Sequence, residues 1–219
     1  MNYLAPSLLA CDFAKLGEEI KIISDGGAQY IHIDVMDGLF VPSISFGMPV
    51  IKSIRKCTDH IFDVHLMIEE PQRYIEAFAQ AGADIITVHA ESCRHLDRVI
   101  HQIHETGKKA GIALNPATSL TVLEHILPDA DMILIMTVNP GFGGQKYIPY
   151  CTQKVRDLRE LIERKGLTTD IEVDGGITLQ NVSEVLEAGA NVVVAGTSVF
   201  KGDAKENVAA FLKKMEVRI

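Results

Sequence analysis

The chain has 219 residues, of which 47% are hydrophobic and 23% charged, and its formal net charge is −8. This length suits one domain with a sizeable core, and the acidic balance argues against nucleic acid, which usually binds to a basic face. No apolar run reaches the ~18 residues of a membrane span, and no secretory signal opens the chain. Four scattered cysteines are typical of free thiols in a reducing compartment, so we expect a cytoplasmic protein that binds neither nucleic acid nor membranes.

A short motif recurs along the chain, in which a glycine precedes an apolar run rich in β-branched residues. It occurs at residues 27–33, 82–88 and 189–195. Glycine suits the left-handed position that ends a helix, and the run after it suits a strand buried on both faces, as in a parallel sheet. On this basis we predict eight strands, at residues 4–8, 30–35, 61–67, 85–89, 110–114, 132–136, 170–173 and 192–195.

Between these strands, apolar residues recur at helical spacing. The clearest stripes are Phe13, Leu16, Ile20 and Ile23; Tyr74, Phe78 and Ala81, with Pro71 in a first helical turn; Val155, Leu158, Leu161 and Ile162; and Val182, Val185 and Leu186. Alternation of strands and helices predicts an α/β fold. Eight units in about 220 residues favour a single closed (β/α)8 TIM barrel that spans residues 1–219.

Polar side chains stand at the ends of the second, third and seventh predicted strands, where barrels of this class carry their active sites. Side chains alternate along a strand, so His32 and Asp34 share the inward face. His65 and Asp174 end the other two strands. Such groups are costly to bury unless they are paired or coordinated. Two imidazoles and two carboxylates suit Zn²⁺, Fe²⁺, Mn²⁺ or Co²⁺, so we predict one divalent metal ion, the alternative being a hydrogen-bonded polar cluster that caps the core.

Glycine-rich turns follow the sixth, seventh and eighth predicted strands. Their backbone amides can approach an anion closely, and the last two loops of this fold are its usual phosphate site. These turns are residues 139–145, 175–176 and 196–198, and we predict that they bind a phosphate. The alternative is that these glycines only make tight turns.

Five segments together resemble the ribulose-phosphate 3-epimerase family, in order and over essentially the whole chain. They are residues 6–9, 32–38 with 40–42, 63–68, 136–145 and 172–177. These segments are long and therefore specific. Ser43 departs from the pattern, because the family is expected to carry Asn there more often; it lies beyond the strand end and bears only on local loop hydrogen bonds.

The resemblance implies epimerisation of D-ribulose 5-phosphate to D-xylulose 5-phosphate at C3, through a metal-stabilised 2,3-enediolate. Asp34 and Asp174 would be the acid/base groups on opposite sides of the substrate, as well as metal ligands with His32 and His65. Ser7 and His65 would contact the substrate. Its phosphate would contact Gly141, Phe142, Gly143, Gly144, Gly175, Gly176, Gly196 and Thr197. The resemblance also implies a homo-oligomer. The cavity would be lined by three methionines, which are equally consistent with ordinary core filling: Met36, Met67 and Met136.

Three alternatives stay open or are disfavoured. The same chemistry on D-allulose 6-phosphate stays open. That sugar is one carbon longer, and the sequence does not indicate the length of the pocket. A decarboxylase of this fold would carry Asp-x-Lys-x-x-Asp at the end of the second strand, but here Met36 occupies the position of the lysine. A Schiff-base aldolase would need an inward-facing lysine on a strand, and no predicted strand contains a lysine. A non-catalytic metal- or sugar-phosphate-binding protein is the third. His89 ends the fourth strand, but it is equally consistent with a hydrogen-bonded core histidine and is left outside the predicted site.

Overall fold

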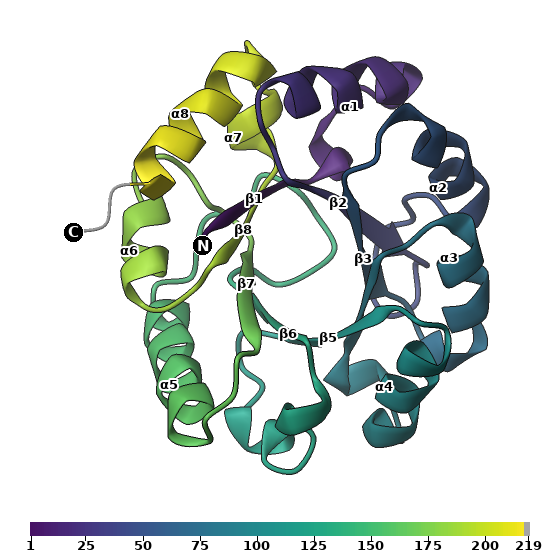
Figure 1. Cartoon of the computed structure of the whole chain (residues 1–219), viewed down its shortest axis with the longest axis vertical. Coiled ribbons are helices and arrows are strands. Elements are labelled where there is room, and N and C mark those ends of the chain that lie inside the picture. Colours follow the sequence, from purple (N-terminus) through teal and green to yellow (C-terminus); the bar gives the residue numbers. More distant parts are fainter. Residues whose placement is uncertain (217–219) are drawn as a thin grey trace.

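The computed structural model describes residues 1–216 and shows a ring of strands surrounded by helices (Figure 1). The last three residues of the predicted domain, 217–219, lie outside this described part. The strands are β1 (Tyr3–Pro6), β2 (Tyr30–Met36), β3 (Ile61–Met67), β4 (Ile85–His89), β5 (Lys109–Leu114), β6 (Met132–Met136), β7 (Asp170–Asp174) and β8 (Val192–Ala195). The α-helices are α1 (Leu16–Asp25), α2 (Met48–Ile54), α3 (Ile75–Ala81), α4 (Leu96–Glu105), α5 (Tyr150–Arg164), α6 (Val182–Glu187), α7 (Thr197–Phe200) and α8 (Ala204–Glu216).

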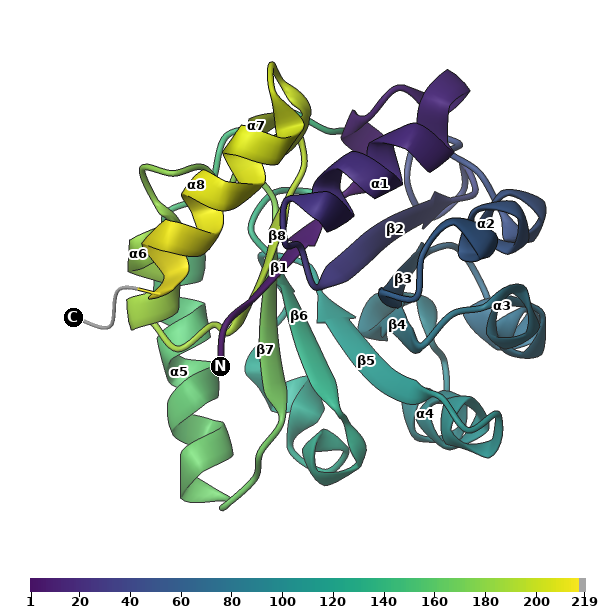
Figure 2. The ribbon, with the colours of Figure 1, turned by 45° about the horizontal axis from the view of Figure 1, so that its top comes forward.

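All eight strands are parallel and follow the order β1-β8-β7-β6-β5-β4-β3-β2. The ring closes where β1 meets β2, through a single parallel bridge between Ser7 and His32. The helices lie on the outside of this ring, and the chain runs round it once from β1 to β8 (Figures 1 and 2). The predicted (β/α)8 TIM barrel is therefore confirmed.

The first strand ends earlier than the sequence predicts. β1 stops at Pro6, and the Ser7 hydroxyl then accepts a hydrogen bond from the amide of Leu9 at 3.3 Å. This cap begins a 3₁₀ turn over Leu8–Ala10, so Leu8 belongs to a turn and not to the strand. A side chain that bonds its own backbone two residues on competes with the strand ladder in this way.

The predicted stripe through Tyr74 is wrong at its first residue. Pro71 does open a helical turn, but this is a 3₁₀ turn over Pro71–Arg73 that follows the left-handed Glu70, whose φ is 48°. α3 starts only at Ile75, and Tyr74 is 38% exposed. Phe13 is similarly displaced, since it lies in a 3₁₀ turn ahead of α1 and is 46% exposed.

The recurring glycines serve the predicted purpose. Gly27, Gly82 and Gly189 have φ values of 98°, 115° and 110°, respectively, and each lies between a helix and the next strand. Residues with a Cβ adopt this region only rarely. The repeat in the sequence therefore reports the repeated helix-to-strand turn of the barrel.

Alternate residues of each strand face either the helices or the barrel interior. Ile31, Ile33 and Val35 pack in the main apolar core between the ring and its helices. A separate apolar cluster includes Tyr30 and Ile85 and fills the interior at the amino ends of the strands. Polar side chains occupy the interior above it, towards the carboxyl ends. Within residues 1–216, no helix has both the length and the apolar character needed to cross a membrane.

Candidate active site and metal centre

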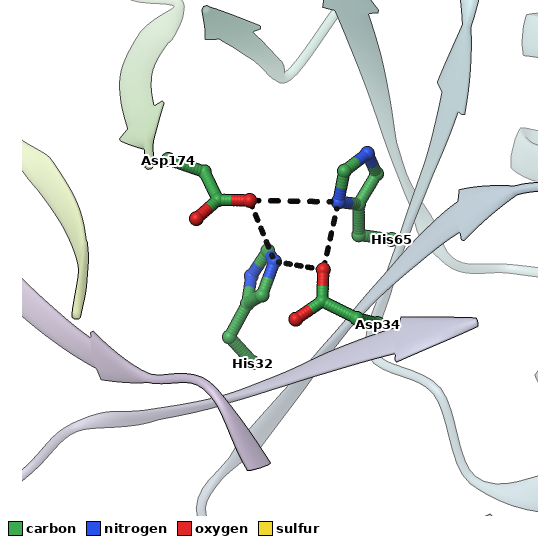
Figure 3. Close-up of side chains that lie close together, drawn as sticks. All are labelled: His32, Asp34, His65 and Asp174. Carbon is green, nitrogen blue, oxygen red and sulfur yellow. Dashed lines mark hydrogen bonds and ion pairs between the residues drawn. The ribbon is translucent and has the colours of Figure 1, made fainter. Parts of the chain in front are cut away.

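Four polar side chains meet inside the barrel at the carboxyl ends of β2, β3 and β7 (Figure 3). Asp34 and His65 occupy paired positions on neighbouring strands, and His65 Nδ1 lies 3.2 Å from Asp34 Oδ1. His32 Nε2 lies 3.4 Å from Asp34 Oδ1 and 4.0 Å from Asp174 Oδ2. His65 Nδ1 is 3.9 Å from Asp174 Oδ2. The structure thus brings together all four residues predicted to hold a metal.

His32 is oriented by a carboxylate beneath it. Its Nδ1 lies 2.6 Å from Asp63 Oδ2, and both side chains are fully buried. An imidazole that donates through Nδ1 carries its lone pair on Nε2, and His32 Nε2 has no hydrogen-bond partner among the described residues. In the neutral ring, which is the form that binds a metal ion, Asp63 therefore aims the lone pair of His32 at the centre of the cluster, as residues behind metal ligands commonly do.

Glu172 lies below the same ring, with its Oε1 3.5 Å from His32 Nδ1. Burial, reinforced by the charge of Asp63, raises the pKa of Glu172 well above its ordinary value. Neither Asp63 nor Glu172 was among the predicted site residues. The signal was available, because each precedes a predicted ligand by two positions and so shares its inward face.

The two upper carboxylates have opposite electrostatic surroundings. Burial opposes ionisation of Asp34, but the charge of His32 and the hydrogen bond with His65 outweigh it and hold the pKa of Asp34 below its ordinary range. Ser7 donates a hydrogen bond of 2.6 Å to Asp34 Oδ2. Burial, together with the charge of Asp34, raises the pKa of Asp174 to about 7. Near neutral pH the pair thus offers one carboxylate and one group able to hold a proton.

The second histidine of the cluster continues into a chain of buried polar groups. His65 Nε2 lies 2.8 Å from His89 Nε2, and His89 Nδ1 lies 3.2 Å from Glu91 Oε2. Both imidazoles are fully buried, and burial lowers the pKa of His89 to about 4. His89, which the sequence left outside the site, is therefore a neutral ring in direct contact with a predicted ligand.

The cluster fits a divalent cation. Ligands 2.0–2.1 Å from a tetrahedral ion lie about 3.3–3.4 Å from one another. The distances from an imidazole nitrogen to a carboxylate oxygen range here from 3.2 to 4.0 Å, and all four facing atoms lie within 4.8 Å of one another. Burial alone would lower the pKa of His32, yet the charges of Asp34, Asp63 and Glu172 raise it well above its ordinary value. The carboxylates therefore favour added positive charge here, and two nitrogen and two oxygen donors are suited to Zn²⁺ and its neighbours among divalent ions.

A cavity of about 580 Å³ opens above Asp34 and Asp174, which both line it. His32 and His65 are fully buried below and are not part of its lining. The other predicted residues that line it are Ser7, Met36, Met67, Met136, Gly141, Phe142, Gly143, Gly144, Gly175, Gly176, Gly196 and Thr197. Lys146 and Lys201 also line it; neither was predicted, since a lysine in a loop is more often solvated.

Glycine is required where the turn after β7 meets the loop after β6. Gly176 has a φ of 67°, and a Cβ there would overlap the backbone amide of Tyr147 and lie 3.0 Å from the carbonyl oxygen of Gln145. The two turns can pack this closely only because the side chain is absent. Their backbones thus form one wall of the cavity, at the end that the sequence predicts for phosphate.

Comparison with known proteins agrees with this site. A model of the Ribulose-phosphate 3 epimerase family matches residues 3–200. The ribulose-phosphate 3-epimerase of Synechocystis sp. is 55% identical over 199 residues, which cover 90% of this chain and 86% of that protein. The Bacillus subtilis ribulose-phosphate 3-epimerase is 52% identical over 211 residues, covering 95% and 97%.

Among solved structures, KGPDC from Streptococcus mutans matches with a TM-score of 0.74 over 99% of this chain and 98% of that chain. At 12% identity this likeness shows the shared barrel fold alone. The family match and the curated relatives, by contrast, extend over nearly all of the sequence. By these similarities the chain belongs to the ribulose-phosphate 3-epimerase family.

Proposed function

We propose that this protein is an isomerase that interconverts D-ribulose 5-phosphate and D-xylulose 5-phosphate by inverting C3. The observation that carries the proposal is the placement of two carboxylates, Asp34 on β2 and Asp174 on β7. They reach the floor of one cavity from different strands, with the His32 and His65 nitrogens between them. Inversion requires this arrangement, because a proton must leave one face of the carbon and another must arrive on the opposite face.

Asp34 and Asp174 would exchange roles with the direction of the reaction. The carboxylate form of one accepts the C3 proton, and the protonated form of the other donates to the opposite face. The pKa of about 7 for Asp174 and the lowered pKa of Asp34 support such a pair, since one group is charged while the other can hold a proton. The Ser7 hydrogen bond to Asp34 Oδ2 would keep that carboxylate in one orientation during proton transfer.

We propose His32, Asp34, His65 and Asp174 as the ligands of one divalent ion, either Zn²⁺, Fe²⁺, Mn²⁺ or Co²⁺. When bound, such an ion supplies positive charge that stabilises negative charge developing on the substrate oxygens. Met36, Met67 and Met136 would surround the reacting carbons with thioethers that exclude water and offer no proton.

The glycine turns after β6, β7 and β8 would bind the substrate phosphate through their backbone amides, with Lys146 and Lys201 nearby as cations. Ser7 and His65 are proposed to assist in substrate binding. Ser7 lines the cavity, whereas His65 lies below it and would act through its contact with Asp34. The four cysteines are free thiols, which supports a reducing, cytoplasmic location. We further propose a homo-oligomer, as light scattering of the purified protein would test.

Proton NMR of D-ribulose 5-phosphate in D2O, with the zinc-loaded protein, tests the function. We expect D-xylulose 5-phosphate that carries deuterium at C3. The same experiment with D-allulose 6-phosphate measures preference between the two sugars. Absence of both product and C3 exchange with ribulose 5-phosphate would reject the proposal, and faster turnover of the hexulose phosphate would reassign the substrate.

A further inference from the structure

Both histidines of the metal cluster must present a lone pair to its centre, and the ring proton of each must therefore sit on the other nitrogen. For His32 the contact with Asp63 decides this directly. His65 has no carboxylate on its far side. Its Nε2 faces only another imidazole nitrogen, His89 Nε2, at 2.8 Å. The tautomer of His65 is consequently decided by the tautomer of His89.

Two neutral imidazole nitrogens at this distance form a hydrogen bond only if one carries the proton and the other the lone pair. Two arrangements are possible. In one, His65 donates to His89, and His65 Nδ1 is left with a lone pair towards Asp34. In the other, His89 donates to His65, and His65 Nδ1 carries a proton towards Asp34. The first arrangement suits a metal ligand, and the second blocks coordination.

Two carboxylates act on this pair of rings. Asp34 Oδ1 lies 3.2 Å from His65 Nδ1 and by itself favours the second arrangement, although Asp34 already accepts a hydrogen bond from Ser7. Glu91 favours the first arrangement from outside the cluster. Its Oε1 accepts hydrogen bonds from the amide of Asn115, at 2.8 Å, and from the hydroxyl of Thr118. Burial opposes ionisation of Glu91, but the hydrogen bonds with His89, Thr118 and Asn115 lower its pKa to about 2. Its Oε2 faces His89 Nδ1 at 3.2 Å. A carboxylate only accepts, so His89 must donate through Nδ1 and accept through Nε2. His65 must then donate through Nε2.

The position of Glu91 is itself supported. Its side chain is 23% exposed and is anchored to the loop after β5 through Asn115 and Thr118. That loop is tied to α5, because Lys154 Nζ donates to the carbonyl oxygens of Asn115 at 2.7 Å and Pro116 at 3.3 Å. The carboxylate is thus fixed from the side opposite to His89.

We propose that Glu91, acting through His89, is a positioning residue that fixes His65 in the tautomer whose Nδ1 lone pair faces the metal site. The inference rests on the metal site proposed above. It gives each imidazole ligand a carboxylate that sets its ring proton: Asp63 by direct contact for His32, and Glu91 through an intervening ring for His65. Residues behind metal ligands typically affect metal affinity by roughly 10- to 100-fold.

Glu91→Gln is the decisive variant, because it keeps the shape of the side chain and reverses the chain of hydrogen bonds. The amide oxygen of the glutamine must face the Asn115 amide, which only donates, so its NH2 group faces His89 Nδ1. His89 then donates through Nε2, and the proton of His65 moves to Nδ1. Thr118→Val is the matched control, since it removes another hydrogen bond of Glu91, while the hydrogen bond from the Asn115 amide and the contact with His89 remain to keep the carboxylate ionised.

The probe is zinc, titrated against a chromophoric chelator with metal-stripped protein. We expect Glu91→Gln to raise the Kd for zinc by roughly 10- to 100-fold and Thr118→Val to leave it within about threefold of wild type. Equal zinc affinity in wild type and a folded Glu91→Gln protein would overturn the role of Glu91. Absence of zinc binding by wild type would overturn the metal site and this inference together.

Ring ¹⁵N NMR of the metal-stripped wild-type protein tests the same inference without any substitution. We expect a proton-bearing Nε2 and a lone-pair Nδ1 for His65, and a proton-bearing Nδ1 for His89. The opposite pair of tautomers would overturn the proposal, including in the case that Glu91→Gln fails to fold. Neither readout depends on epimerase activity, so a wrong substrate assignment would leave both results intact.

Discussion

Replacing either carboxylate of the proposed acid/base pair by its amide separates the two halves of the reaction. In Asp34→Asn, the amide oxygen can still accept from Ser7, whose hydroxyl lies 2.6 Å from Asp34 Oδ2. Its NH2 group can donate to His65 Nδ1, which lies 3.2 Å from Asp34 Oδ1. The polar contacts are thus satisfied in the metal-free variant, while one proton acceptor and one proposed metal ligand are lost.

The expected cost in stability is small and the cost in rate large. Exchanging a hydrogen bond to a charged acceptor for a neutral one lowers the free energy of unfolding by about 1 kcal/mol, or about 2–4 °C in Tm for a chain of this size. Loss of a general acid or base slows turnover by about 10²- to 10⁴-fold. This corresponds to an increase of about 3–5.5 kcal/mol in the activation free energy of proton transfer. Thermal unfolding and a coupled epimerase assay measure the two quantities.

Deuterium exchange at C3 gives the more specific result. With saturating zinc in D2O, Asp34→Asn should exchange the C3 proton only in the epimer whose proton faces Asp174, with retention of configuration. Asp174→Asn should exchange the proton only in the other epimer. Exchange of the same epimer by both variants, or near-normal epimerisation by either, would refute the assignment of one carboxylate to each face.

Three further substitutions address the supports of the site. Asp63→Asn should raise the Kd for zinc by roughly 10- to 100-fold, because the buried Oδ2 that accepts from His32 Nδ1 loses its charge; an unchanged chelator titration would contradict this. Gly176→Ala should lower the free energy of unfolding by about 1–3 kcal/mol and raise KM for the sugar phosphate, because φ is 67° and the new methyl meets the Tyr147 backbone; calorimetry and steady-state kinetics measure both. Ser7→Ala should lower the free energy of unfolding by about 1.5–3 kcal/mol, because the buried Asp34 carboxylate loses the hydrogen bond from the hydroxyl. Urea unfolding measures this, and equal stability of the two proteins would contradict a stabilising role for the hydroxyl.

The barrel and the convergence of His32, Asp34, His65 and Asp174 could be predicted from the sequence because both depend on local periodicity. Strands buried on both faces appear as short β-branched runs, and glycines with φ near 100° mark where each repeat turns from helix to strand. Along a strand, alternation places His32 beside Asp34 on the inward face whatever the rest of the chain does. Once the strands were found, the fold class itself required their carboxyl ends to meet.

Local signals were weaker where two interactions compete. Ser7 caps a turn and thereby ends β1 early, and Tyr74 sits in the gap between a 3₁₀ turn and α3. In both places a sequence pattern compatible with strand or helix was overridden by backbone hydrogen bonds of neighbouring residues. The boundaries of the elements were therefore less well determined than their number and order.

Only the tertiary structure decided which polar groups support the ligands. His89 and Glu91 lie more than twenty positions after His65, and their contacts depend on the register of β4 against β3 and on the loop that carries Asn115. The sequence does not distinguish a histidine that packs in the core from one that binds a metal or one that sets the tautomer of a neighbouring histidine. Sequence alone thus determined the barrel and the facing proposed ligands, because these follow from periodicity. The direction of each hydrogen bond followed from which donors and acceptors the folded chain brings within 3 Å or so of one another.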